Sequence, residues 1–294
     1  YKNAIVLAEL ESDKKMQLLN KISESLLIRS SEILSANMKD VEFGRKNGLT
    51  EALIDRLSLN QSRIEDISNS IIQISNLDDP IGNLLESWTQ PNGLHIRKVR
   101  VPLGVIGMIY EARPNVTADA LAIGIKTGNA IVLRGSASAY QSNLAIINVF
   151  KDCLETHGIN IECIQLLEDT SRESVLKFIK MNNYLNLIIP RGGAGLINSV
   201  VENASVPTIE TGVGNCHVYI DEFADIDQAI QITDNSKTQR PSVCNACETI
   251  LIHKNIAETF LTQLHKIFTE KNVTVKGCEK TLKFYLQLIH FKKI

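Results

Sequence analysis

Cys244 is the residue of this 294-residue chain whose type and surroundings point most directly to chemistry. It lies in QRPSVCNACETILIH, residues 239–253, after a proline-led turn and before the apolar run Thr249–His253, which predicts a strand. Its neighbours Ser242 and Asn245 are small, so they leave room for a ligand instead of filling a core. A cysteine at the mouth of a sheet can attack a small substrate and form a covalent intermediate. We therefore predict that Cys244 is a nucleophile.

Cys247 follows Cys244 at CxxC spacing, which is also typical of thiol-redox couples and zinc sites. A zinc site needs a second pair of ligands, and Cys216–His217 is the only adjacent pair of such residues in the chain. Structural zinc sites use spaced ligands, so we predict no metal and expect Cys247 to be a small buried hydrophobe. A CxxC thiol-redox or zinc protein is the alternative that these residues leave open.

A glycine-rich turn, Pro190–Gly195, follows one expected strand and precedes an expected helix. Glycines let a phosphate approach the backbone, where free N–H groups and the helix dipole attract it. We therefore predict that Arg191, Gly192 and Gly193 bind a cofactor phosphate. The turn lacks the GxGxxG fingerprint, so an ordinary strand-to-helix turn is the alternative.

Arg134, Gly135 and Ser136 stand at the C-terminal end of an expected strand, the edge at which open α/β sheets bind ligands. The Arg134 guanidinium can pair with a ribose 2′-phosphate, the group that separates NADP from NAD. Lys126, at the end of the preceding expected helix, completes this predicted cofactor set. A solvated basic residue at a strand end is the alternative for Arg134.

Asn115 and Glu210 are the remaining candidates for chemistry. Asn115 precedes an expected helix, so it is either the N-cap or a side-chain amide that stabilises a developing oxyanion. Glu210 begins the stretch Glu210–His217, whose glycines allow the backbone to pass close to a ligand. Its carboxylate is either a base or an exposed loop group.

The elements that would position these residues alternate between strand and helix after Pro102. Continuous apolar runs such as Leu103–Tyr110 are typical of buried parallel strands, and their alternation with helices predicts a doubly wound α/β sheet. The expected strands are 103–110, 130–134, 163–167 and 185–189, and the helices between them are 117–127, 141–156 and 171–181. A second α/β segment has expected strands 217–220 and 249–253 and expected helices 226–236 and 256–269.

The residues before this alternation predict helices and a ribbon. Apolar residues at helical spacing favour helices over 14–36, from Thr50, and over 62–77. A turn signal at Pro91–Gly93 and alternation after it predict a β-ribbon at about 88–101. A two-stranded ribbon is not stable alone in water, so we expect it to pair with another subunit or to form a surface hairpin.

Domain boundaries are soft because the chain has no internal repeat and no low-complexity linker. The best candidate is Pro207–Gly214, which gives domains 1–211 and 212–294.

Composition excludes several classes of protein. The chain is 44% hydrophobic and 22% charged, with a formal net charge of −2, so we expect neither a nucleic-acid nor a membrane partner. No apolar run approaches the roughly 20 residues that a membrane-spanning helix needs. Six cysteines without a secretory leader favour reduced thiols and a cytoplasmic location.

Five stretches, taken together and in order, resemble the γ-glutamyl phosphate reductases of the aldehyde dehydrogenase superfamily. They are RKVRVPLGVIGMIYEARPNVTADA from Arg97, KTGNAIVLRGSASAYQSN from Lys126, LIIPRGGAGLI from Leu187, PTIETGVGNCHVYID from Pro207 and QRPSVCNACETILIH from Gln239. The resemblance extends to about residue 277. It implies an aldehyde-dehydrogenase-like α/β fold, with a Rossmann-type NADP-binding domain at 1–211 and an α/β catalytic domain from 212.

The resemblance also implies a reaction: NADPH-dependent reduction of L-glutamyl 5-phosphate to L-glutamate 5-semialdehyde, with release of phosphate, in proline biosynthesis. Cys244 would displace phosphate to give a thioester, and the cofactor would then supply hydride. Asn115 matches the oxyanion-hole asparagine, and the backbone N–H of Cys244 would be the second donor. Arg134–Ser136 match the ribose-binding position and Gly192–Gly193 the pyrophosphate position. Glu210 matches the general base of hydrolytic relatives, and its role stays open because phosphate replaces water.

From about Cys278 the chain continues as CEKTLKFYLQLIHFKKI, which has no counterpart in the family. We therefore expect the catalytic domain to be incomplete and to lack the glycine-rich stretch that holds the nicotinamide ribose in relatives. The alternative to an active oxidoreductase is a truncated, catalytically impaired remnant that still binds NADP(H). The family further implies a homo-oligomer and functional pairing with a glutamate 5-kinase.

Overall fold

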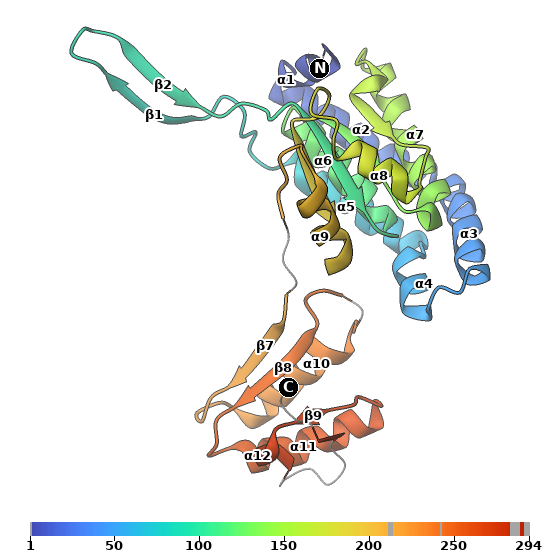
Figure 1. Cartoon of the computed structure of the whole chain (residues 1–294), viewed down its shortest axis with the longest axis vertical. Coiled ribbons are helices and arrows are strands. Elements are labelled where there is room, and N and C mark those ends of the chain that lie inside the picture. Colours follow the sequence, from blue (N-terminus) through green and yellow to red (C-terminus); the bar gives the residue numbers. More distant parts are fainter. Residues whose placement is uncertain (1, 211–213, 242, 283–288, 291–294) are drawn as a thin grey trace. The chain divides into compact units, whose positions relative to one another are not determined.

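The computed structural model describes residues 2–210, 214–241, 243–282 and 289–290. The chain divides into two compact units, Tyr1–Gly212 and Val213–Ile294 (Figure 1). The expected domain boundary between residues 211 and 212 falls within 211–213, which lie outside the described residues. Among the described residues, no helix is long and apolar enough to span a membrane.

Unit 1 is built on a parallel sheet with the order β5-β4-β3-β6. Its central strand β3 is almost entirely buried, as the apolar run of its sequence predicts. The strands are β3 (Val105–Tyr110), β4 (Ala130–Arg134), β5 (Ile164–Leu166) and β6 (Leu187–Arg191), and the helices that follow them are α6 (Pro114–Lys126), α7 (Tyr140–Thr156), α8 (Arg172–Phe178) and α9 (Ala194–Asn203). Short 3-10 turns η1 (Ala137–Ala139) and η2 (Ile161–Cys163) flank α7. The predicted doubly wound α/β fold is confirmed.

The strand order reverses between β3 and β6. The chain runs outward from β3 through β4 to β5 and then returns to place β6 on the other side of β3. A parallel bridge between Ile188 and Thr208 adds one more extended segment beyond β6. In open sheets of this kind, ligands bind where the order reverses, at the carboxyl ends of the strands.

An outer layer of helices shares the core of unit 1. It consists of α1 (Lys2–Ala8), α2 (Ser12–Ile28), α3 (Ser30–Lys46), α4 (Glu51–Leu57) and α5 (Gln61–Ser75). Leu18 and Ile22 of α2 and Ile71 of α5 are fully buried in the same cluster as the sheet. Each such side chain contributes roughly 1.5–3 kcal/mol through removal of apolar surface from water.

The expected single helix over 14–36 is wrong: it is two helices, broken at Arg29. The backbone of Arg29 leaves the helical region, at φ −96° and ψ 19°. Its guanidinium donates to Glu32 at 2.8 Å and to Asp152 of α7 at 2.5 Å. The hydrophobic pattern continues through the break because both helices bury residues in one core.

Asp40 of α3 caps α7 from outside that helix. Its carboxylate accepts hydrogen bonds from the backbone N–H of Ser142 at 2.7 Å, the Ser142 hydroxyl at 2.6 Å and the Gln141 N–H at 3.2 Å. These N–H groups belong to the first turn, where a helix has no internal acceptors. Burial raises the pKa of the Asp40 carboxyl, and the hydrogen bonds from Ser142 and Gln141 oppose that effect.

The predicted ribbon is present and begins four residues earlier, as β1 (Leu84–Thr89) paired antiparallel with β2 (His95–Val99). Gly93 has a φ of +85°, which the tight turn requires and glycine adopts without strain. Figure 1 shows the ribbon extending away from the helices and sheet of unit 1. Its apolar side chains Leu85, Trp88 and Leu94 are exposed by 47%, 43% and 57%.

Unit 2 contains a parallel pair, β7 (Cys216–Ile220) and β8 (Cys247–Ile252), covered by α10 (Ile226–Thr238) and α11 (Ala257–Glu270). Its core cluster is separate from that of unit 1 and includes Ile220, Phe260 and Leu264. The remaining described elements are β9 (Lys276–Gly277), α12 (Glu279–Leu282) and β10 (Ile289–His290), with β9 and β10 paired in parallel.

Candidate active site

Most of the predicted residues of unit 1 lie at the carboxyl edge of its sheet. Arg134 ends β4, Arg191 ends β6, and Asn115 follows β3 in the first turn of α6. Glu210 comes two residues after the bridge at Thr208, so it lies at the same edge and is exposed. The fold thus assembles these side chains where a doubly wound sheet binds its ligand.

Glu111 joins β3 to the turn that begins α9. Its backbone N–H donates to the carbonyl of Arg191 at 3.3 Å, and its Oε1 accepts the backbone N–H of Gly193 at 2.8 Å. A Cβ on Gly192 would lie 2.8 Å from that same oxygen, so only glycine admits the carboxylate at this distance. An anionic group therefore already occupies the start of α9, where N–H groups and the helix dipole favour negative charge.

Glu111 is not among the site residues that the sequence predicts, although it lies at the start of α9 in the structure. The available signal was its position, since it directly follows the apolar run of β3. Its partner Gly193 is 82 residues away in sequence, so only the strand order shows that the two meet.

Arg134 holds the loop before α8 against the end of β4. Its Nη2 donates to the carbonyl oxygens of Thr170 at 2.5 Å and Ser171 at 2.8 Å. Its Nε is buried and finds no hydrogen-bond partner within the part of the chain that the structure describes. Burial lowers the pKa of Arg134, and the nearby Asp169 carboxylate opposes that shift.

Gly135 packs against a buried chain of polar groups. The Tyr110 and Thr117 hydroxyls are 2.7 Å apart, and the Thr117 hydroxyl donates to Asn143 Oδ1 at 2.8 Å. A Cβ on Gly135 would lie 2.3 Å from Asn143 Nδ2, so packing alone requires glycine here. Ser136 then caps η1, because its Oγ accepts the backbone N–H of Ser138 at 3.2 Å. The turn after β4 is therefore held in one shape.

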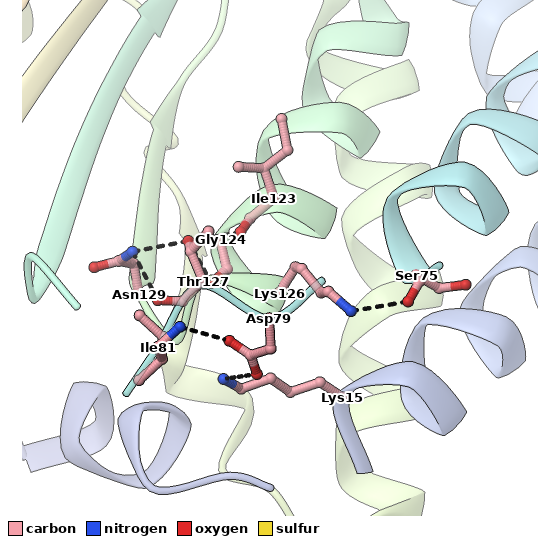
Figure 2. A network of polar contacts seen from close by, with 9 residues as sticks. All are labelled: Lys15, Ser75, Asp79, Ile81, Ile123, Gly124, Lys126, Thr127 and Asn129. Carbon is pink, nitrogen blue, oxygen red and sulfur yellow. Dashed lines mark hydrogen bonds and ion pairs between the residues drawn. The ribbon is translucent and has the colours of Figure 1, made fainter. Parts of the chain in front are cut away.

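The position of Lys126 contradicts the prediction that this residue binds the cofactor. It ends α6, which returns the chain to the opposite, amino edge of the sheet, next to the start of β4. Its side chain is 4% exposed, and its Nζ donates to the carbonyl of Ser75 at 2.8 Å (Figure 2). The ammonium therefore serves the carboxyl end of α5, where a positive charge stabilises the helix dipole.

Asn115 is the second residue of α6, whose N-cap is Arg113 and whose first residue is Pro114. The simpler expectation that Asn115 is the N-cap is therefore wrong. Its side chain is exposed, and Nδ2 makes a long contact of 3.5 Å to Asp119 Oδ2. Asp119 also accepts the Ser70 hydroxyl at 3.1 Å, and burial raises the pKa of its carboxyl. The Asn115 amide thus contacts Asp119 of the same helix and is open to solvent.

In unit 2, Cys244 lies exposed in the loop that leads into β8. The Cys216 thiol donates to its carbonyl oxygen at 3.5 Å, and Cys216 pairs in register with Cys247. Cys247 is 3% exposed, as predicted for a small buried hydrophobe. Cys163 is also buried, which raises its pKa to about 12, so it stays protonated at neutral pH.

No group of three metal-ligating side chains occurs among the residues that the structure describes. Ser242, one of the small neighbours of Cys244 in sequence, lies outside those residues.

Comparisons with known proteins agree with this fold. The model of the aldehyde dehydrogenase family matches residues 7–281. The γ-glutamyl phosphate reductase of Clostridium perfringens strain SM101 is 52% identical over 270 residues, which are 92% of this chain and 65% of the relative. That of Heliobacterium modesticaldum is 49% identical over 282 residues, covering 96% of this chain and 68% of the relative.

A solved structure points to the same family. The crystal structure of γ-glutamyl phosphate reductase from Thermotoga maritima superimposes with a TM-score of 0.88 at 42% identity, over 99% of this chain and 70% of that one. The chain spans about two thirds of the length of the curated relatives that it matches. The chain therefore belongs to the aldehyde dehydrogenase family, and its relatives within that family are γ-glutamyl phosphate reductases.

Proposed function

We propose that the chain acts as an NADPH-dependent glutamate-5-semialdehyde dehydrogenase. It would reduce L-glutamyl 5-phosphate to L-glutamate 5-semialdehyde with release of phosphate, in proline biosynthesis. The observation that carries the proposal is the exposed Cys244 thiol in a chain 52% identical over 270 residues to a γ-glutamyl phosphate reductase.

Cys244 has the central chemical role in this proposal. Its thiolate attacks the acyl carbon of the substrate, the bond from that carbon to the phosphate oxygen breaks, and phosphate leaves. The product is a thioester on Cys244, which reduction converts to the aldehyde with return of the thiol. Attack places negative charge on the acyl oxygen, and the Asn115 amide and the Cys244 backbone N–H would donate to it. Glu210 is given no role in these steps. Its counterpart in hydrolytic relatives is a general base, and in this reaction phosphate takes the place of water.

The residues of unit 1 fit a dinucleotide cofactor. The start of α9 already holds the Glu111 carboxylate on the Gly193 N–H, and a phosphate oxygen would accept the same donor. Gly192 and Gly193, with the neighbouring Arg191, would hold the pyrophosphate, and Arg134, Gly135 and Ser136 the ribose with its 2′-phosphate. NADPH, when bound, supplies the hydride for the reduction. Lys126 is left out of this set because its ammonium is buried against Ser75.

We include self-association through the ribbon in the proposal. Among the described residues β1 and β2 pair only with each other. Trp88 of β1 and Leu94 of the turn are exposed and form apolar surface that another copy would cover. A cytoplasmic location is consistent with six free thiols. Supply of the acyl phosphate by a glutamate 5-kinase is part of the same proposal, because acyl phosphates hydrolyse in water.

The experiment follows NADP+ reduction by glutamate 5-semialdehyde with and without phosphate. We expect phosphate-dependent activity that falls by at least about 10³-fold in Cys244→Ala. Cys247→Ala is the matched control, because Cys247 is buried three residues away, and it should remain active. Full activity of Cys244→Ala would show that the nucleophile is assigned wrongly.

Calorimetry with NADPH separates the enzyme from the impaired alternative. Binding of NADPH without any turnover would support a remnant that keeps only the cofactor site.

A further inference from the structure

The Glu111 carboxylate occupies the position in which the proposed cofactor needs to place a phosphate oxygen. Its Oε1 is 2.8 Å from the backbone nitrogen of Gly193, the N-cap residue of α9. Glu111 reaches this point from the end of β3, and Gly193 lies just beyond the end of β6. The contact therefore spans the point at which the strand order of the sheet reverses.

A backbone N–H has one hydrogen, so the Gly193 N–H cannot donate fully to a carboxylate and a phosphate at once. The two anions would also repel each other at contact distance. A pyrophosphate can bind at the start of α9 only after the carboxylate has moved away.

The surroundings permit such a movement. Glu111 is exposed, so its side chain can rotate into water. Among the described residues, apart from those adjacent in sequence, a Cβ on Gly193 would meet only Glu111 Oε1 within 4 Å, at 3.5 Å. Among the described residues, and leaving aside the backbone of its own helix, a Cβ on Gly195 would meet nothing within 4 Å. The space beside the Cα atoms of Gly193 and Gly195 is therefore open, so close side-chain packing does not fill the start of α9 there.

We propose that Glu111 is an internal competitor of the cofactor: its carboxylate occupies the pyrophosphate position of the free protein and is displaced when the dinucleotide binds. The inference rests on the proposed function for the identity of the ligand. It adds a residue that weakens cofactor binding and assists release of the spent cofactor. The carboxylate also keeps the start of α9 satisfied while no phosphate is present.

The test measures binding, with inorganic pyrophosphate and NADPH as separate probes. Both are titrated by calorimetry in magnesium-free buffer at fixed ionic strength, into the wild-type chain and its variants. Glu111→Ala removes the competing carboxylate, and we expect it to bind both probes about fivefold more tightly, the effect of losing one competing hydrogen bond of ordinary strength.

Glu111→Asp separates the effect of the hydrogen bond to Gly193 from the effect of the negative charge. Aspartate keeps the negative charge but is one methylene too short to reach Gly193, so the proposal predicts tighter binding for this variant as well. Glu51→Ala is the matched control, because Glu51 is an exposed glutamate in the first turn of another helix, α4. Its affinities should equal those of the wild type.

Unchanged or weaker pyrophosphate binding by both Glu111 variants would overturn the inference. Tighter pyrophosphate binding without any NADPH binding would keep the inference and reject the proposed cofactor. Circular dichroism of each variant confirms that the fold is retained.

Discussion

The buried ion pair between Lys15 of α2 and Asp79 gives the sharpest prediction for stability. Lys15 Nζ is 2.8 Å from Asp79 Oδ2, and the two side chains are only 1% and 12% exposed (Figure 2). Lys15→Met keeps the length of the side chain and removes its charge. Among the described residues, Asp79 then retains one donor, the backbone N–H of Ile81 at 3.0 Å, for a carboxylate that has little access to water.

The expected loss follows from the burial of both groups. Removing one partner of a buried pair costs about 3–5 kcal/mol, because the other charge is left uncompensated. The remaining hydrogen bond from Ile81 and the residual exposure of Asp79 reduce this cost. We therefore expect Lys15→Met to lose about 3 kcal/mol of unfolding free energy, the lower end of that range. The double variant Lys15→Met, Asp79→Asn removes both charges and should lie within about 1 kcal/mol of the wild type.

The assay is urea-induced unfolding at 25 °C, followed by far-ultraviolet circular dichroism. Unit 1 contains helices α1 to α9, so its transition dominates the signal. A loss below about 1 kcal/mol in Lys15→Met would refute the reasoning. So would a double variant that is as unstable as the single one, because the cost would then come from packing and not from the isolated charge.

The remaining predictions concern pH, packing and association. Burial raises the folded-state pKa of Asp40, so the folded state holds that proton more tightly than the unfolded state. The stability of the wild type relative to Asp40→Asn should therefore be greatest below about pH 4 and fall as pH rises from there toward the raised pKa, which urea titrations from pH 4 to 7 would show. Gly124→Ala would place a Cβ 2.3 Å from Ile131 Cγ1 and should lower the free energy of unfolding by about 1–3 kcal/mol, as measured by thermal unfolding. Gly195→Ala, with open space around the new Cβ, should not lower it. Trp88→Lys adds a charge to the exposed ribbon and should abolish self-association, as measured by light scattering; an unchanged mass would exclude the ribbon as the contact.

Local rules explain what the sequence predicted correctly. Buried parallel strands appear as apolar runs, and the expected strand 130–134 matches β4 (Ala130–Arg134). Helix caps are local as well: Thr50 accepts the N–H of Leu53, and Ser171 accepts that of Ser174. These features need only neighbours along the chain.

Contacts between distant residues explain what the sequence could not supply. Arg29, at which the two helices break, donates to Asp152, 123 residues away. The Lys126 ammonium donates to the carbonyl of Ser75, 51 residues away, whereas the sequence alone suggested a cofactor ligand. Glu111 carried no visible role until the strand order placed β6 next to β3.

Trapping of the covalent intermediate tests the central claim most directly. The chain is incubated with L-glutamate 5-semialdehyde and NADP+ in phosphate-free buffer, and its cysteine peptides are analysed by mass spectrometry. Without phosphate as acceptor the thioester persists, so we predict a glutamyl adduct on Cys244 that disappears when phosphate is added. An adduct on Cys216 or Cys247 instead, or turnover without any adduct on Cys244, would contradict the assignment of Cys244 as the nucleophile.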